Sequence, residues 1–142
     1  MMKFLSRSVD KKGTDSQARA PVPYQSVITT QSVVMPGVVF MINRISFGRR
    51  MELSRLVREI TRKAEFLEAG TDLQERIEAG ILTHEVDAMY LRWGLVSLEG
   101  LTIDGMPAAP EQLLDSGPEP LTQEIVAAIK AQCGLSKAER KN

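Results

Sequence analysis

The sequence predicts an α+β fold, a mostly helical single domain with a small antiparallel sheet and a disordered N-terminal tail. Two patterns support this prediction. Residues 38–45 and 95–103 are rich in β-branched and other apolar residues, which is typical of strands. Longer segments between and after them carry apolar residues every three or four positions, which is typical of helices that face a core. We therefore expect the two strands to pair and the helices to cover them.

The chain divides into three parts by composition. Residues 1–23 are polar and end in Pro-Val-Pro, so we expect them to form the disordered tail. The globular domain is expected over 24–134, and residues 135–142 are expected to be frayed. The strand at 38–45 is entered through Pro36 and Gly37, and a further strand is expected around 27–34.

The longest predicted helix begins near 46–49 and ends at Gly70. Its apolar residues share a stripe about 100° wide, which predicts its buried side. These residues are Leu53, Leu56, Val57, Ile60, Ala64 and Leu67. Next we expect a short helix over 72–79 that ends at Gly80, and then a separate helix that Thr83 caps and Gly94 ends.

The remaining elements follow the same signals. One face of the helix after Thr83 is apolar and is expected in the core; it consists of Val86, Met89, Tyr90 and Trp93. A single helical turn is expected at 111–115. The last helix is expected over 120–133, with proline at its start, and Gly134 ends it. Its buried face is Leu121, Ile125, Ala128 and Ile129.

Composition excludes several classes of protein. Hydrophobic residues make up 43% and charged residues 25%, which is ordinary for a soluble globular domain. Cys133 is the single cysteine, so a disulfide framework and a cysteine-based zinc site are excluded. No apolar run is long enough to span a membrane or to form a secretory signal, which favours a cytoplasmic location.

The formal net charge of zero hides a strong segregation of charge. Residues 44–63 hold seven basic and two acidic side chains, whereas residues 64–128 hold two and thirteen. This separation favours electrostatically guided contact with a partner or self-association, and solvated faces of opposite sign are the alternative. The acidic body disfavours nucleic acid as the partner.

The sequence lacks the standard catalytic motifs, among them GxxxxGK[ST], GxGxxG, GxSxG and HExxH. His84 and Asp87 have the i, i+3 spacing of a metal pair, so a metal-dependent enzyme is one alternative, although an exposed histidine is the simpler interpretation. Cys133 is expected to be a small apolar residue at the edge of the last helix's buried face. We therefore expect no catalytic residue, no cofactor and no metal.

The candidate partner-binding site lies on the predicted helix before Gly70, opposite its apolar stripe. At about 100° per residue, its three arginines span about 60° of the helix, between two apolar side chains. The five residues are Met51, Arg55, Arg58, Arg62 and Phe66. Arginine, methionine and aromatic residues are enriched at protein interfaces. The alternative is a solvated face with Arg55–Glu59 and Glu59–Lys63 pairs, which leaves both apolar side chains in water.

Six segments of the chain carry a family resemblance. They are 34–38 (VMPGV), 42–53 (INRISFGRRMEL), 90–95 (YLRWGL), 100–105 (GLTIDG), 117–125 (GPEPLTQEI) and 135–142 (LSKAERKN). Together they resemble the tail-assembly chaperones, small proteins encoded ahead of the tape-measure gene in long-tailed bacteriophages and prophages. The resemblance covers about residues 33–142.

The resemblance implies a non-catalytic function in the bacterial host cytoplasm. Such a chaperone binds the tape-measure protein, keeps its apolar helices from aggregating and helps to recruit the tail-tube protein. The alternative is a structural component of the virion, at the tail or at the head–tail junction. The resemblance transfers no binding residue to this chain, so the site prediction depends on the arginine pattern alone.

Overall fold

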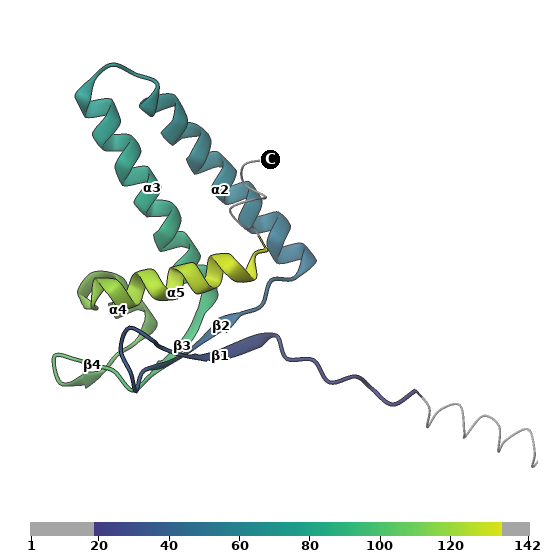
Figure 1. Ribbon diagram of the computed structural model, residues 1–142. Helices are drawn as coiled ribbons and strands as arrows, with labels where there is room; N and C mark the ends of the chain where they lie inside the picture. The colour runs from purple at the N-terminus through teal and green to yellow at the C-terminus, as the bar shows by residue number, and fades with distance from the viewer. Residues whose placement is uncertain (1–18, 135–142) are drawn as a thin grey trace, which may run out of the picture.

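The computed structural model describes residues 19–134, and a three-stranded antiparallel sheet forms its base (Figure 1). The strands are β1 (Val27–Gln31), β2 (Val39–Asn43) and β3 (Leu95–Glu99), in the order β1-β2-β3. Phe40 and Ile42 of the central strand are both buried, because alternate side chains of a strand point to the same face. The predicted α+β class and the predicted pairing of 38–45 with 95–103 are confirmed.

Helix α2 (Phe47–Glu68) follows the sheet and matches the helix predicted to end at Gly70. Ser46 is its N-cap, and the Ser46 hydroxyl accepts a hydrogen bond from the backbone N–H of Arg49 at 3.2 Å. Leu53 and Ala64 are buried, as the apolar stripe predicts. The prediction for Leu56 is wrong, because Leu56 lies at the edge of the stripe and is 44% exposed.

Helix α3 (Leu73–Gly94) is one continuous helix, so the predicted break between 72–79 and Thr83 is wrong. Gly80 stays helical, because a single glycine lowers helix stability by only about 1 kcal/mol. Thr83 does not cap a helix; its hydroxyl donates to the carbonyl oxygen of Ala79 at 3.0 Å. Asp72 is the N-cap instead, and its carboxylate accepts from the N–H of Gln74 at 3.1 Å.

The expected strand over 95–103 is shorter in the structure. It ends as β3 at Glu99, because Gly100 adopts a φ of 85° and turns the chain. Thr102–Ile103 (β4) then pairs with Met106–Pro107 (β5) in a separate two-stranded sheet. Helix α4 (Pro110–Ser116) and helix α5 (Glu119–Gln132) follow close to their predicted positions.

The core forms where α5 crosses the base of the α2–α3 hairpin above the sheet (Figure 1). Leu121, Ile125 and Ile129 of α5 are completely buried there. The end of α3 packs tightly against α5, since a Cβ atom on Gly94 would lie 2.6 Å from Cγ2 of Ile129. Away from this base the hairpin projects from the molecule, so both of its outer faces are open to partners.

Two predictions fall on residues that the structure does not fully describe. The predicted tail over 1–23 lies mostly outside the described residues, and the predicted frayed segment 135–142 lies wholly outside them. Within residues 19–134, no helix combines the length and the apolar character that a membrane crossing requires.

Candidate protein-binding site

The outer side of α2 carries the five residues of the predicted site, which we call the arginine face: Met51, Arg55, Arg58, Arg62 and Phe66. All five are exposed, with Met51 at 53% and Phe66 at 79%. They lie on the side of the helix opposite buried Leu53 and Ala64. The predicted outward orientation is therefore confirmed.

The charges of the arginine face are not neutralised within the described part of the chain. Among residues 19–134, the only ion pair joins Lys130 Nζ to Asp87 Oδ1 at 2.6 Å. The Arg55–Glu59 and Glu59–Lys63 pairs of the alternative interpretation do not form, and exposed pairs of this kind gain little free energy in water. The three guanidinium groups are thus available to carboxylates of another molecule.

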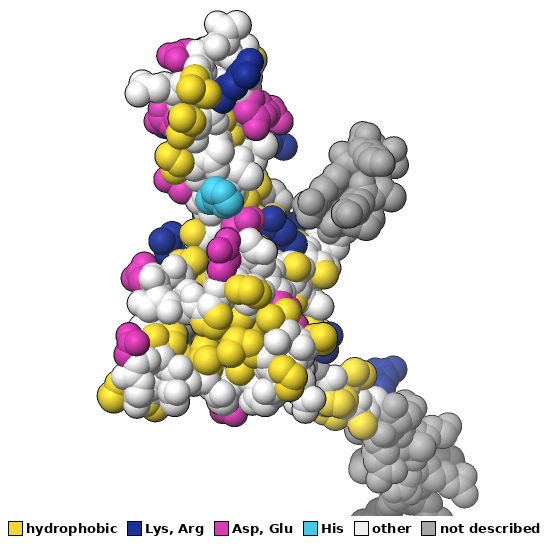
Figure 2. All heavy atoms as spheres, turned by 60° about the vertical axis from the view of Figure 1, so that its left-hand side comes forward, with side chains coloured by type: hydrophobic (Ala, Val, Ile, Leu, Met, Phe, Trp, Pro, Cys, Tyr) yellow, Lys and Arg dark blue, Asp and Glu magenta, His cyan; other side chains and the backbone are white. Residues whose placement is uncertain are grey.

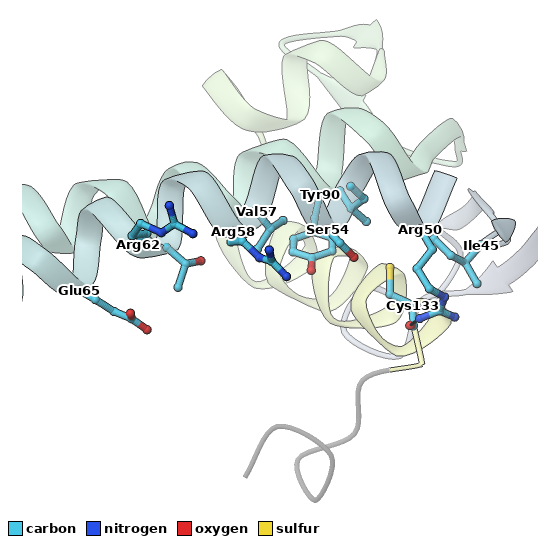
Figure 3. Close-up of a pocket in the computed structure, with 11 residues that line it drawn as sticks. Ile45, Arg50, Ser54, Val57, Arg58, Arg62, Glu65, Tyr90 and Cys133 are labelled. Carbon is cyan, nitrogen blue, oxygen red and sulfur yellow. Dashed lines mark hydrogen bonds between the residues drawn. The ribbon is translucent and has the colours of Figure 1, made fainter. Parts of the chain in front are cut away.

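A groove of about 480 Å³ runs along α2 beside the arginine face (Figure 3). Its apolar floor comes from three parts of the fold: Ile45 before α2, Leu53 and Val57 of α2, and Tyr90 of α3. Arg58 and Arg62 belong to both the arginine face and the groove. The groove therefore offers apolar surface next to unpaired positive charge, which suits an amphipathic partner.

The groove ends at the last turn of α5, where Arg50 holds the helix terminus. Its Nη1 donates a hydrogen bond to the carbonyl oxygen of Cys133. A cation is favourable at this position, because unpaired carbonyl groups give a helix C-terminus partial negative charge. Arg50 thus fixes α5 against the start of α2 and shapes one wall of the groove.

Cys133 lines the same groove but is 4% exposed. Burial raises the pKa of the Cys133 thiol, although the Arg50 guanidinium acts in the opposite direction. A raised pKa keeps the thiol protonated, and a protonated thiol is a poor nucleophile. The expectation that Cys133 is a small apolar residue of the core is confirmed.

Glu124 makes contacts that the sequence alone did not predict. Its carboxylate accepts hydrogen bonds from the Ser32 hydroxyl at 2.5 Å, from the Val33 N–H at 2.7 Å and from the Val34 N–H at 3.4 Å. Burial acts to raise the pKa of the Glu124 carboxyl, but the three hydrogen bonds outweigh it and hold the pKa below its ordinary value. Glu124 therefore fastens the β1–β2 loop to α5 as a carboxylate.

The two residues of the metal hypothesis lie apart from this site. His84 is exposed on α3, and Asp87 pairs with Lys130 of α5. Within the described residues, no three His, Cys, Asp or Glu side chains lie close enough together to hold a metal ion. Asp87 therefore has a structural role in the α3–α5 contact, whereas His84 forms no ion pair with any of the described residues.

No protein-family model matches the chain, and neither does any curated protein or solved structure. The functional argument therefore depends on the arginine face and its groove.

Proposed function

We propose that the protein is a non-catalytic binding factor that holds a helical segment of another protein on the arginine face. The observation that carries the proposal is a set of three arginines that form no ion pair with any residue of 19–134 and that lie between two exposed apolar side chains, Met51 and Phe66. In aqueous solution such apolar exposure is unfavourable, whereas an interface uses it as an anchor.

The chemistry of the arginine face specifies its partner. An arginine fork donates two parallel hydrogen bonds to one carboxylate and loses its hydration more readily than lysine does. The partner is therefore an amphipathic helix with acidic side chains next to an apolar stripe. That stripe would rest on exposed Met51 and Phe66, with the acidic side chains beside the arginines between them.

The biological role that fits this chemistry is that of a tail-assembly chaperone acting in the bacterial host cytoplasm. The family resemblance supports this role, with the tape-measure protein as client and the tail-tube protein as a further partner. The arginine face lies open at the surface rather than in an enclosed cavity, which suits a client that is later released. No step of this function needs a catalytic residue, a cofactor or nucleic acid.

A structural component of the virion, at the tail or the head–tail junction, is the second candidate. Exposed Leu73, Ile77 and Ile81 on α3 favour it, because a permanent assembly would cover them. Mass spectrometry of purified particles separates the two roles. Abundant copies in mature particles would favour the structural role, and their absence would favour the chaperone.

Co-purification with the tape-measure protein tests the chaperone proposal. Arg55→Glu combined with Arg62→Glu should abolish co-purification, and Phe66→Ala should weaken binding by about 2 kcal/mol. Because all three residues are exposed, the melting temperature should hardly change.

The matched control is Lys63→Glu with Arg76→Glu, which changes the net charge equally at exposed positions outside the arginine face. The control should retain the client. If the arginine-face variant also retains it at both low and high salt, the arginine face does not bind the client and the proposal is wrong.

A further inference from the structure

The three-stranded sheet has two edges, and only one of them is protected against pairing with another strand. Natural sheets protect an edge with a charged side chain, a bulge, a proline or a covering element. The β3 edge has exposed Glu99, a break in its register with β2 at Met41–Ile42, and a contact with helix α4. Strand β1 has no charged residue and no proline, and its register with β2 is regular. Among residues 19–134, β2 is the only strand that pairs with β1.

The hydrogen bonds of β1 identify which of its backbone groups face outward. The carbonyl oxygen of Ser26 accepts from the N–H of Arg44 at 2.8 Å, so the even-numbered residues of this strand face β2. Backbone groups alternate in direction along a strand. The N–H and C=O groups of Val27, Thr29 and Gln31 therefore point away from β2, and we call these groups the β1 edge.

The β1 edge is complementary to itself. When two β1 strands run antiparallel with Thr29 opposite Thr29 of a second copy, Val27 of each copy lies opposite Gln31 of the other. Each opposing pair exchanges two backbone hydrogen bonds, so every group of both edges finds a partner. Only this register pairs all three outward residues within β1. No charge opposes the contact, and threonine pairs across two strands are favourable.

Exposed apolar side chains flank β1 at both of its ends. Residues 19–26 form an arm that continues from β1 away from the body (Figure 1), and its Val22 and Tyr24 are 86% and 71% exposed. Figure 2 shows apolar side chains where this arm leaves the body, at the lower right. Val33 and Val34 follow β1 and are 85% and 47% exposed. A single copy thus leaves apolar surface in water before and after the same strand.

The register centred on Thr29 brings these two flanks together. Tyr24 and Val34 are equally far from Thr29 along the chain, so Tyr24 of one copy lies level with Val34 of the other, at each end of the contact. Both flanks are already held in place. The Arg44 guanidinium lies 5.7 Å from the centre of the Tyr24 ring, and the Glu124 carboxylate accepts from the Val34 N–H at 3.4 Å. Positioning before binding reduces the entropy that association costs.

Prolines limit how far this pairing extends. Pro21 and Pro23 are in phase with the outward residues of β1, and proline has no N–H to donate. The ladder therefore ends before the arm reaches them. Because the β3 edge is protected, the resulting sheet presents no second edge for a third copy.

We propose that two copies of this chain form a twofold dimer through antiparallel pairing of their β1 strands, centred on Thr29. The contact is isologous, because each copy contributes the same surface, and it joins the two sheets into one. A strand of another protein could use the same backbone groups, but the match between the two flanks of β1 selects β1 itself. The inference goes beyond the proposed function, because the β1 edge contains no residue of the arginine face.

Analytical ultracentrifugation of the full chain up to about 1 mM tests the inference. The wild type should change from monomer to dimer and form nothing larger, and salt should hardly affect it, because the β1 edge carries no charge. Thr29→Pro removes an outward N–H but no hydrogen bond to β2, so it should raise the dissociation constant at least about tenfold. The matched control, Thr29→Val, keeps this N–H and should dimerise at least as well as the wild type.

A pair of charged variants provides the decisive measurement. Thr29→Lys alone and Thr29→Glu alone place like charges opposite each other at the centre of the contact, so each should be monomeric. An equimolar mixture at low salt places opposite charges there and should form one-to-one heterodimers. The inference is overturned by a wild type that stays monomeric, by a proline or charged variant that dimerises as the wild type does, or by a mixture that stays monomeric.

Two controls keep this outcome interpretable. Circular dichroism should show unchanged secondary structure, and the charged variants replace Thr29→Pro if the proline variant fails to fold. All variants at Thr29 should still co-purify with the client, so failure of dimerisation and failure of client binding are distinguishable. Loss of the client from Thr29→Pro, with a monomeric wild type, would assign the β1 edge to a strand of the client and overturn the inference.

Discussion

Two leucines on adjacent turns of α2 provide a direct test of how the hairpin packs. Leu53 is 3% exposed and belongs to the main core, whereas Leu56 is 44% exposed at the edge of the same stripe. Replacing buried leucine by alanine removes transfer free energy and leaves a cavity, so Leu53→Ala should lower the free energy of unfolding by about 3 kcal/mol. Leu56→Ala leaves no enclosed cavity and should lower it by about 1 kcal/mol or less.

Urea unfolding followed by circular dichroism measures both values on proteins that differ at one position. A loss of about 3 kcal/mol in a chain of this size corresponds to a fall of about 10 °C in melting temperature, which calorimetry checks independently. Equal losses for the two variants would show that Leu56 is as buried as Leu53. The position of Leu56 at the exposed edge of the apolar stripe would then be wrong.

Two further predictions concern contacts that join distant parts of the chain. Glu124→Gln should lower the free energy of unfolding by about 1–2 kcal/mol near pH 7, because a neutral amide accepts weaker hydrogen bonds than a carboxylate. The folded state lowers the pKa of Glu124, so this contribution is fully present above the unfolded pKa and is lost as pH falls through the folded pKa. Gly94→Ala should lower the free energy of unfolding by about 1–3 kcal/mol through overlap with buried Ile129, whereas Gly80→Ala should raise it by up to about 1 kcal/mol.

Urea unfolding near pH 7 and at about pH 3 tests the prediction for Glu124. The difference in the free energy of unfolding between wild type and Glu124→Gln should be smaller in acid. A difference that stays constant with pH would mean that the charge of Glu124 adds nothing to the three hydrogen bonds. If Gly94→Ala and Gly80→Ala changed the free energy of unfolding equally, that result would contradict the close contact between α3 and α5.

The helices and the central strand could be predicted because their signals are local. Ser46 and Gly70 mark the ends of α2, and the alternation around Phe40 marks β2. The exposure of the arginine face followed from helical periodicity in the same way. The single helix α3 could not be predicted from Gly80 and Thr83, because contacts with α2 and α5 outweigh the low helix propensity of these two residues.

The groove and the Glu124 contacts could not be predicted, because both depend on residues that are far apart in sequence. Cys133 meets Arg50 only after α5 has crossed the base of the hairpin. Glu124 meets Ser32 across 92 positions of the chain. No periodic pattern encodes such pairs, and only the packing of α5 on the sheet brings them together.

The projecting hairpin has a consequence for how the molecule unfolds. Within the described residues, no member of the core cluster lies between Val57 and Val86, and the buried hydrophobic residues of this outer half are the small Ala64 and Ala79. Isolated helical turns are marginally stable in water, so this half should open in brief local excursions while the base stays folded. Amide hydrogen exchange should then be fastest around the tip and slowest in α5. The segment that holds Phe66, Leu73 and Ile77 would thus adjust its shape to a partner at little free-energy cost to the rest of the fold.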